Sequence, residues 1–303
     1  MLTDVGTMTR WTACAFGFVV ACGRRPPDSV ALDPGTTAAP STAAPSTAAS
    51  TVVSFPLPSA GEAPTALLIP PRAHAPEAPP AGWCGETAIQ EGLLSLGVWA
   101  PQRLINKAGK PVHPDLYSTD IPVALSDLGV RHSFYSGGKG FDAFARWVAK
   151  AVDEGDPVLA GVKILPTEHP EWGLDHFVLV VGHREGELLV NTTWGSRRWV
   201  GATTTPGLSF KNAFYAIRLT GLTLPPPARP ARLIVLDEDA SVVKVRVTCA
   251  GLKTDTAYRM ERRTARSDEK PIWSEELTAD GEHVEKELTL DASRPARFHC
   301  SPL

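Results

Sequence analysis

The feature that most constrains the fold is a change in the spacing of apolar residues near Pro157. Before it, apolar side chains recur at helical spacing, as in Ile89, Leu93 and Leu96. After it, the segments PVLAGVKIL, HFVLVVGH and ELLVNTTW are short apolar runs of the kind that form strands. Helices grouped first and antiparallel strands grouped second predict an α+β domain over residues 81–222.

Turn and capping residues give the elements of this domain. Four helices are predicted: Glu86–Leu96, a short helix from Pro101 to Gly109, Ile121–Leu128 and Phe141–Glu154. The last two of the three apolar runs are joined by Arg184-Glu185-Gly186, a turn that suits a hairpin, and a further strand is predicted over Ala213–Leu219. Three consecutive prolines, 225–227, mark the end of the domain.

The residues before this domain have a different composition. Residues 22–80 are dominated by Pro, Ala, Ser and Thr and contain the near-repeat TAAPSTAAPSTAAST. They lack the apolar periodicity that could offset the entropy cost of ordering a chain. We therefore expect a flexible tether, within which only ALLIP (Ala66–Pro70) could pack locally.

The first 21 residues have the features of a bacterial lipoprotein signal peptide. Arg10 precedes the apolar run WTACAFGFVVA, which is too short to span a bilayer. The run ends in VVAC, which resembles the box at which lipoprotein leaders are cleaved and the cysteine, here Cys22, is lipidated. Met8 makes a more conventional start than Met1, because Asp4 places an acid in the leader. We expect a protein exported to the cell envelope and anchored in a membrane through Cys22. An ordinary secretory signal cut elsewhere and a buried N-terminal helix are the alternatives.

The C-terminal residues, 228–303, are strand-like throughout, with turns rich in Asp, Gly, Lys and Pro. They predict a small β-sandwich-like accessory domain. Such a domain buries little surface, so a cross-link would stabilise it, and an exported protein meets oxidising conditions. Cys249 and Cys300 are the cysteines in this region, and we expect them to form a disulfide.

Composition and spacing argue against several functional classes. The formal charge is only −3, and the densest basic stretch, MERRTAR, is interleaved with polar and acidic residues, so no nucleic-acid partner is expected. His169, His176 and His183 recur every seven residues, but this spacing places His176 and His183 on opposite faces of a strand. No cysteine pair or HExxH motif accompanies them. Neither a metal nor another cofactor is predicted.

Two residues combine into a candidate catalytic pair. Cys84 precedes the first predicted helix, where the partial positive charge of the helix N-terminus favours a thiolate. His176 begins a predicted strand after an irregular loop and could act as its base. Asn191, in the paired strand, could orient the imidazole.

The segments around these residues resemble the papain-like cysteine peptidases, most closely the branch of bacterial double-glycine leader peptidases (cysteine peptidase family thirty-nine). The resembling segments are GWCGETAIQEGLLSLG, DHFVLVVGH and LLVNTTWG, which follow in the family's order over residues 82–219. The resemblance implies a papain-like domain with Cys84 as nucleophile, His176 as general base and later acid, and Asn191 as the third member.

The sequence departs from this family in two places. Many relatives have a Gln about six residues before the nucleophile, which donates into the oxyanion hole, whereas this chain has Ala78 there. In relatives with an Asn-Ser-Trp-Gly motif, the Asn stands two residues before the Trp, and that position is Thr192 here. Thr192 is therefore an alternative to Asn191.

The predicted function is hydrolysis of peptide bonds, in peptide or protein substrates, through a thioester on Cys84. Two alternatives remain open. The same thiol site could be an amidase on other substrates or an acyltransferase to amines. A catalytically silent papain-like domain could instead bind peptides or cell-wall material.

Overall fold

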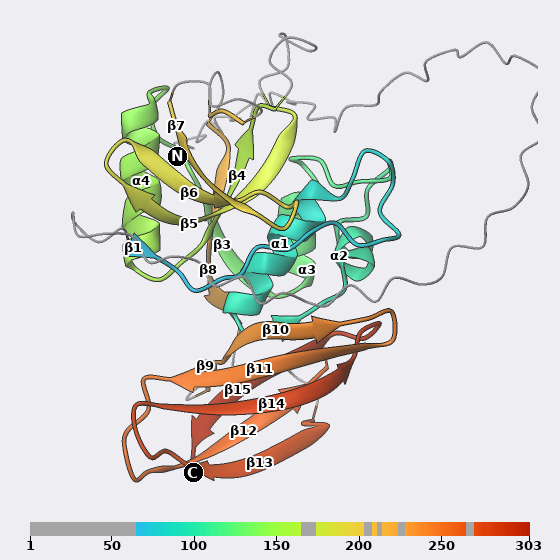
Figure 1. The fold of residues 1–303 in the computed structure, drawn as a ribbon, viewed down its shortest axis with the longest axis vertical. Coiled ribbons are helices and arrows are strands. Elements are labelled where there is room, and N and C mark those ends of the chain that lie inside the picture. The colour runs from blue at the N-terminus through green and yellow to red at the C-terminus, as the bar shows by residue number, and fades with distance from the viewer. Residues whose placement is uncertain (1–64, 165–173, 203–207, 211–213, 224–227, 265–269) are drawn as a thin grey trace, which may run out of the picture.

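The computed structural model describes residues 65–164, 174–202, 208–210, 214–223, 228–264 and 270–303 (Figure 1). These residues form helices and antiparallel sheets, which confirms the prediction of a mixed fold with antiparallel strands. The predicted signal peptide, Cys22 and most of the predicted tether lie outside the described residues. Within those residues, no helix combines the length and the apolar character needed to cross a bilayer.

Four helices lie where the sequence predicts them. They are α1 (Cys84–Ser95), α2 (Gln102–Gly109), α3 (Ile121–Asp127) and α4 (Phe141–Asp153). Gly97 and Gly129 follow α1 and α3 with φ values of 75° and 68°, a left-handed conformation that ends a helix and that glycine adopts without steric cost.

A seven-stranded antiparallel sheet makes up the rest of this region. Its path is β3-β8-β4-β5-β6-β7, and β1 also pairs with β5. The predicted hairpin joins β5 to β6, whereas β3 and β7 are half-exposed strands whose polar residues gave no apolar run to predict them. The bounds are β1 (Thr65–Ala66), β3 (Val130–Phe134), β4 (Val158–Val162), β5 (His176–Arg184), β6 (Glu187–Asn191), β7 (Arg197–Gly201) and β8 (Ala216–Leu222).

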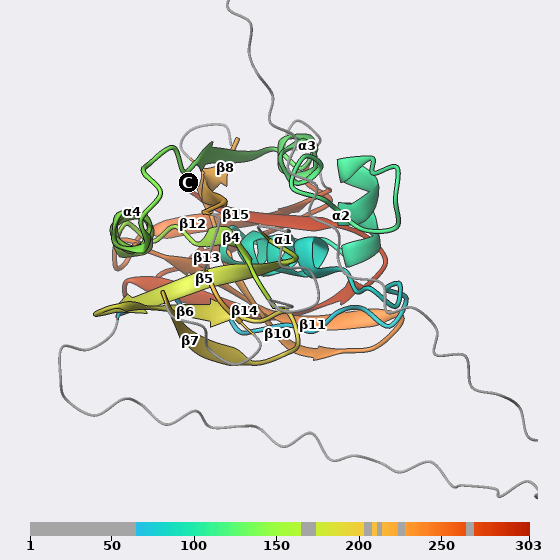
Figure 2. The same ribbon diagram turned by 90° about the horizontal axis from the view of Figure 1, so that it is seen from above.

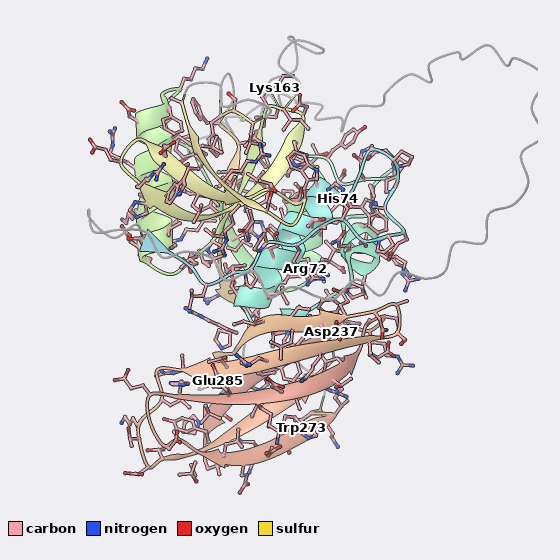
Figure 3. All side chains as sticks on the ribbon, viewed as in Figure 1. Arg72, His74, Lys163, Asp237, Trp273 and Glu285 are labelled. Atoms are coloured by element: carbon pink, nitrogen blue, oxygen red, sulfur yellow. A yellow bond between two sulfur atoms is a disulfide. The ribbon has the colours of Figure 1, made fainter. Side chains whose placement is uncertain are left out.

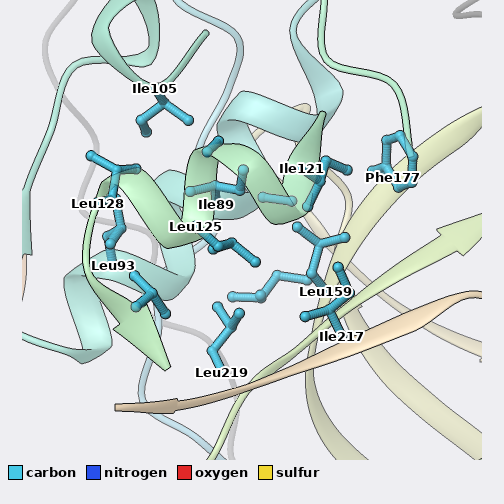
Figure 4. Packing of buried hydrophobic residues seen from close by; sticks show 14 of the residues in the cluster. Ile89, Leu93, Ile105, Ile121, Leu125, Leu128, Leu159, Phe177, Ile217 and Leu219 are labelled. Atoms are coloured by element: carbon cyan, nitrogen blue, oxygen red, sulfur yellow. The ribbon is translucent and has the colours of Figure 1, made fainter. Parts of the chain in front are cut away.

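The two faces of this sheet pack against different helices. Side chains alternate between the faces of a strand, so on β4 Leu159 joins the cluster of Ile89 and Leu93 of α1 (Figure 4). Val158 and Ala160 belong to the other cluster, which contains α4. Figure 2 shows α4 apart from the group formed by α1, α2 and α3. The sheet is therefore covered on both faces, and residues 84–94 of α1 are all buried.

The C-terminal region consists of two antiparallel sheets around one apolar cluster. The first contains β10 (Arg232–Glu238), β11 (Val242–Ala250) and β14 (His283–Asp291); the second contains β12 (Ala257–Arg263), β13 (Trp273–Thr278) and β15 (Ala296–Pro302), with the short β9 (Arg229–Pro230) against β15. A disulfide between Cys249 of β11 and Cys300 of β15 links the two sheets, with 6.3 Å between the Cα atoms.

One strand of the C-terminal sheets comes from the helix-containing region, across the division predicted at residues 222–228. After α1, β2 (Val98–Trp99) pairs with β15. The Trp99 side chain is fully buried in the C-terminal cluster, and its Nε1 donates to the Ala292 carbonyl at 3.2 Å. A two-residue strand is too short to give a periodic signal, so the sequence did not indicate this connection.

The prediction of a tether extending to residue 80 is wrong for residues 65–80, which we call the strap. β1 pairs with β5, and the Leu67 amide donates to the Val181 carbonyl at 2.7 Å. Ile69 is only 3% exposed and belongs to the same apolar cluster as α1. The strap is held largely by backbone hydrogen bonds and by a few separate side chains, so it packs without the regular apolar spacing that would have predicted it.

Candidate active site

Cys84 is the first residue of α1, and its side chain is 1% exposed. The preceding residue, Trp83, is fixed by two sets of contacts. Its indole Nε1 donates to the Pro114 carbonyl at 2.9 Å, and its own carbonyl accepts from Thr87 Oγ1 at 2.7 Å. The N–H groups of a first helical turn lack intrahelical partners and carry partial positive charge. The fold therefore places the Cys84 thiol where a negative charge is stabilised.

His176 is the first residue of β5 and is hydrogen-bonded to Cys84. Burial alone lowers the pKa of an imidazole. Here the charge of Cys84, the hydrogen bonds to Cys84 and to the Thr192 carbonyl, and the charge of Asp175 outweigh burial and raise the pKa of His176 above 6.5. A protonated imidazole beside Cys84 favours the thiolate form of the cysteine.

The far side of the imidazole is held by the turn after β6. His176 Nε2 lies 3.0 Å from Thr193 Oγ1 and 3.3 Å from the Thr192 carbonyl oxygen. The Trp194 ring stacks on the His176 ring, with 4.6 Å between centroids and 19° between planes. Thr193 has a φ of 64°, an unfavourable conformation for a β-branched residue. The residue whose hydroxyl contacts the imidazole therefore has a strained backbone conformation.

In the described structure the side-chain hydrogen bonds of Asn191 lead away from His176, so the geometry does not support its predicted role in orienting the imidazole. Its Nδ2 donates to the Ile69 carbonyl at 3.0 Å, and its Oδ1 accepts from Arg197 Nε at 2.9 Å. It ends β6 opposite Leu179, three residues beyond His176. The alternative, Thr192, contributes its carbonyl, while its hydroxyl contacts Ser196. The left-handed turn brings Thr193 into place, and strand alternation could not predict that turn.

The residue before His176, Asp175, belongs to a buried ion pair. Lys163 Nζ lies 3.0 Å from Asp175 Oδ2, and both side chains are at most 2% exposed. Asp175 Oδ1 also accepts from the Ile164 amide at 2.6 Å, which ties the residue before His176 to the segment that follows β4. The sequence analysis missed this pair, since a single lysine after an apolar strand gives no signal of burial.

A buried carboxyl group lies near the thiol. Glu86 Oε1 accepts from Asn106 Nδ2 at 2.7 Å and from the Leu116 amide at 3.0 Å. Burial, and to a lesser degree the charge of Cys84, raise the pKa of Glu86 to about 8, although these hydrogen bonds oppose the shift. Glu86 is therefore mostly protonated at neutral pH and adds little negative charge beside Cys84.

A second imidazole, which the sequence analysis also missed, belongs to the strap. His74 interacts electrostatically with both Cys84 and His176. Burial lowers its pKa below 6.5, and the proximity of His176 adds to this, while the charge of Cys84 opposes it. The sequence analysis missed His74 because it lies in a Pro- and Ala-rich run of the kind that predicts a flexible tether. The one available signal was a single histidine in such a run shortly before Cys84.

The strap also forms one wall of a cleft of about 900 Å³. The other walls are the start of α2 and two turns of the C-terminal region, around Asp239 and Ser293. Figure 3 shows Arg72 beside α1, above the C-terminal sheets. Its Nε donates to Gln90 Oε1 of α1 at 2.8 Å, and its guanidinium pairs with Glu238 of β10. His74 lines this cleft, whereas Cys84 and His176 do not.

The geometry defines a class of site: a buried, hydrogen-bonded thiol and imidazole between a helix N-terminus and an antiparallel sheet. The described residues contain no group of three or more His, Cys, Asp or Glu arranged to hold a metal ion.

Comparisons with known proteins add little to this description. No family model matches the sequence, and no curated protein matches it. One solved structure that resembles the chain is from Bacillus anthracis and is described as a candidate C39-like peptidase; it has a TM-score of 0.36 and 13% identity, and the match covers 52% of this chain and 97% of that one. A likeness this weak establishes neither a family nor an activity.

Proposed function

We propose that this protein is a papain-like cysteine peptidase in which Cys84 is the nucleophile and His176 the general base. The observation that carries the proposal is the hydrogen bond between Cys84, at the start of α1, and His176, at the start of β5. The N-terminus of α1 and the imidazolium of His176 both favour the thiolate, which is the reactive form of cysteine. The order of the Cys, His and Asn-Thr-Thr segments in the sequence agrees with this assignment.

The residues suggest a two-stage reaction. In the first stage, Cys84 Sγ attacks the substrate carbonyl carbon, the C–N bond breaks, and the leaving amine takes its proton from the His176 imidazolium. In the second stage, water attacks the thioester while His176 accepts a proton from it; the carboxylic acid leaves and the thiolate is restored. Thr193 and the Thr192 carbonyl hold the imidazole through both transfers.

The first experiment measures thiol reactivity. Cys84 should react with iodoacetamide already at pH 6, where an ordinary thiol with a pKa of about 8.5 is almost entirely protonated. His176→Ala should remove this advantage. His183→Ala is the matched control, because His183 lies on the same strand and contacts Asp153 instead. If Cys84 reacts at pH 6 no faster than a peptide thiol, the peptidase proposal falls and a binding domain replaces it.

The second experiment separates hydrolysis from acyl transfer. The protein is incubated with a mixture of peptides from digested casein, with and without added glycinamide, and products are identified by mass spectrometry. New carboxyl termini support the peptidase proposal. Products carrying glycinamide as the dominant species would indicate an acyltransferase on the same thiol. Cys84→Ser is the negative control.

We also propose that the protein is exported and anchored in a membrane of the cell envelope through lipidated Cys22, on the basis of the apolar run ending in VVAC. Mass spectrometry of the mature N-terminus tests this. Residues retained before Cys22, or an unmodified Cys22 in the membrane fraction, would contradict it. Cys22→Ser should release the protein from membranes.

A further inference from the structure

The proposed reaction creates a negative oxygen that needs hydrogen-bond donors. When a thiolate attacks a carbonyl carbon, the C=O electron pair moves onto the oxygen, and preorganised donors must stabilise it. The amide of Cys84, in the first turn of α1, can supply one donor. The position where a Gln was expected is Ala78, whose side chain cannot donate.

His74 interacts with the reacting pair from a stretch of the strap whose backbone is hydrogen-bonded on both sides. Before it, the Arg72 carbonyl accepts from the Gly195 amide at 2.9 Å. On both sides of it, Gln102 of α2 holds the backbone, donating to the Ala73 carbonyl at 2.9 Å and accepting from the Ala75 amide at 2.8 Å. The strap therefore fixes the backbone of His74 on either side of the residue.

The ring nitrogen of His74 is available. His74 Nε2 is buried and has no hydrogen-bond partner among the described residues. A buried polar atom without a partner is costly, so a substrate group that pairs with this nitrogen would be bound favourably. Its neighbours are Cys84 and His176, which both act on its charge.

The sequence next to the nucleophile makes room for this ring. Gly82 has a φ of 82°, and a Cβ atom there would lie 2.2 Å from His74 Cε1 and 2.5 Å from Nδ1. Any larger residue at position 82 would displace the imidazole. The glycine two residues before Cys84 therefore serves the position of His74 as well as the turn into α1.

We propose that His74 is an oxyanion-hole donor in the place of the missing glutamine, an inference that rests on the peptidase function proposed above. As Cys84 Sγ bonds to the carbonyl carbon, neutral His74 donates its ring N–H to the oxygen that receives the C=O electron pair. The proton stays on His74; when the oxygen re-forms the carbonyl, the C–N bond breaks and the amine takes its proton from His176. A neutral imidazole carries one such N–H, and the lowered pKa of His74 keeps the ring in this form.

The test compares two reactions of the same thiol in the full protein. Acylation of Cys84 by the 4-nitrophenyl ester of N-acetylglycylglycine passes through an oxyanion and releases coloured nitrophenolate. Alkylation by iodoacetamide replaces iodide at carbon and forms no oxyanion. For His74→Ala we expect ester acylation to fall by about 10²–10³, as for loss of one oxyanion donor, while alkylation changes by less than about twofold.

Two further variants make the result specific. His74→Gln restores a donor and should recover most of the acylation rate, while Gly82→Ala should lose acylation because it displaces the ring. His183→Ala should leave both reactions unchanged, and melting temperatures identify variants that fail to fold. Equal losses of both reactions in His74→Ala, no loss of acylation, or no recovery in His74→Gln would overturn the inference.

The same data separate this inference from the proposed function. If wild-type Cys84 is neither alkylated rapidly at pH 6 nor acylated, the peptidase proposal itself fails. If it is alkylated rapidly but never acylated by the ester, the nucleophile stands and the oxyanion-hole role of His74 is overturned.

Discussion

The candidate site is built from two regions, and the apolar pattern of the sequence predicts one of them but not the other. Cys84 and His176 each open a regular element, α1 and β5, whose apolar pattern predicts it. The strap, which carries His74, is held by backbone hydrogen bonds to β5, to the turn after β6 and to Gln102. Regular elements leave a periodic trace because one face is buried repeatedly. A strap leaves none, although it is equally part of the site.

The largest expected effect comes from removing the strap. A chain beginning at Gly82 should be less stable than a chain beginning at Thr65 by about 4–6 kcal/mol, because it exposes the cluster around Ile69 and leaves backbone groups of β5 without partners. Urea denaturation followed by far-ultraviolet circular dichroism measures the difference.

The Gly82 chain should also lose ester acylation of any remaining folded protein, since it lacks His74. Equal stability of the two chains would show that residues 65–81 are no part of the folded unit. The strap would then not be a structural part of the site.

The second effect compares the ion pairs that hold the two regions. Lys163→Met leaves Asp175 buried without its cation, which should cost about 3–5 kcal/mol. Glu238→Gln removes the charge opposite Arg72, where both side chains are partly exposed, and should cost less than about 1 kcal/mol. Both losses of stability are measured from the urea midpoints of unfolding, provided that the dependence of the unfolding free energy on urea concentration is unchanged. Similar costs for the two variants would contradict the difference in burial.

The sequence predicted the elements far better than it predicted the contacts between them. All four helices follow from apolar spacing and glycine stops, and the β5–β6 hairpin from a turn beside two apolar runs. Cys84 and His176 could be selected as candidates because each begins one of those elements. These features are local, so neighbouring residues determine them.

What the sequence did not indicate depends on long-range packing. β2 is two residues long and pairs with β15, about two hundred residues later in the chain. Thr193 reaches His176 through a left-handed turn that a β-branched residue rarely adopts. His74 is brought to the thiol by a strap without periodicity. In each case the stabilising partner is distant in sequence, and no local pattern carries that information.

The third effect is a pH dependence that arises in the helix region. The pKa of Glu86 is raised from 4.5 to about 8, so the folded state binds the proton more tightly than the unfolded state. This contribution to stability is complete below pH 4.5 and is lost as the pH rises through about 8. Between pH 5 and pH 9 the loss should amount to a few kcal/mol, because each tenfold difference in proton affinity between the two states corresponds to about 1.4 kcal/mol.

Glu86→Gln keeps an oxygen that can accept from Asn106 and Leu116 but cannot ionise. Its free energy of unfolding should therefore fall less than that of the wild type between pH 5 and pH 9. Parallel curves for the two proteins would mean that Glu86 titrates normally and is not enclosed by the folded chain.

The smallest effect concerns the turn that holds His176 from the far side. Thr193→Val removes the hydroxyl that lies 3.0 Å from His176 Nε2 and keeps the branched shape, while the Thr192 carbonyl at 3.3 Å still faces the ring. Because one of two contacts is lost, ester turnover should fall about tenfold, corresponding to one hydrogen bond of roughly 1.4 kcal/mol. Iodoacetamide alkylation at pH 6 should change less, since it needs no proton transfer by the imidazole, whereas hydrolysis of the acyl-enzyme needs His176 to accept a proton from water. Thr193→Ser retains the hydroxyl and should keep most of the turnover.

Asn191→Ala should instead act on stability, because it removes contacts to Ile69 and Arg197. A large loss of turnover in a stably folded Asn191→Ala, with none in Thr193→Val, would reverse this assignment and return the third position to Asn191.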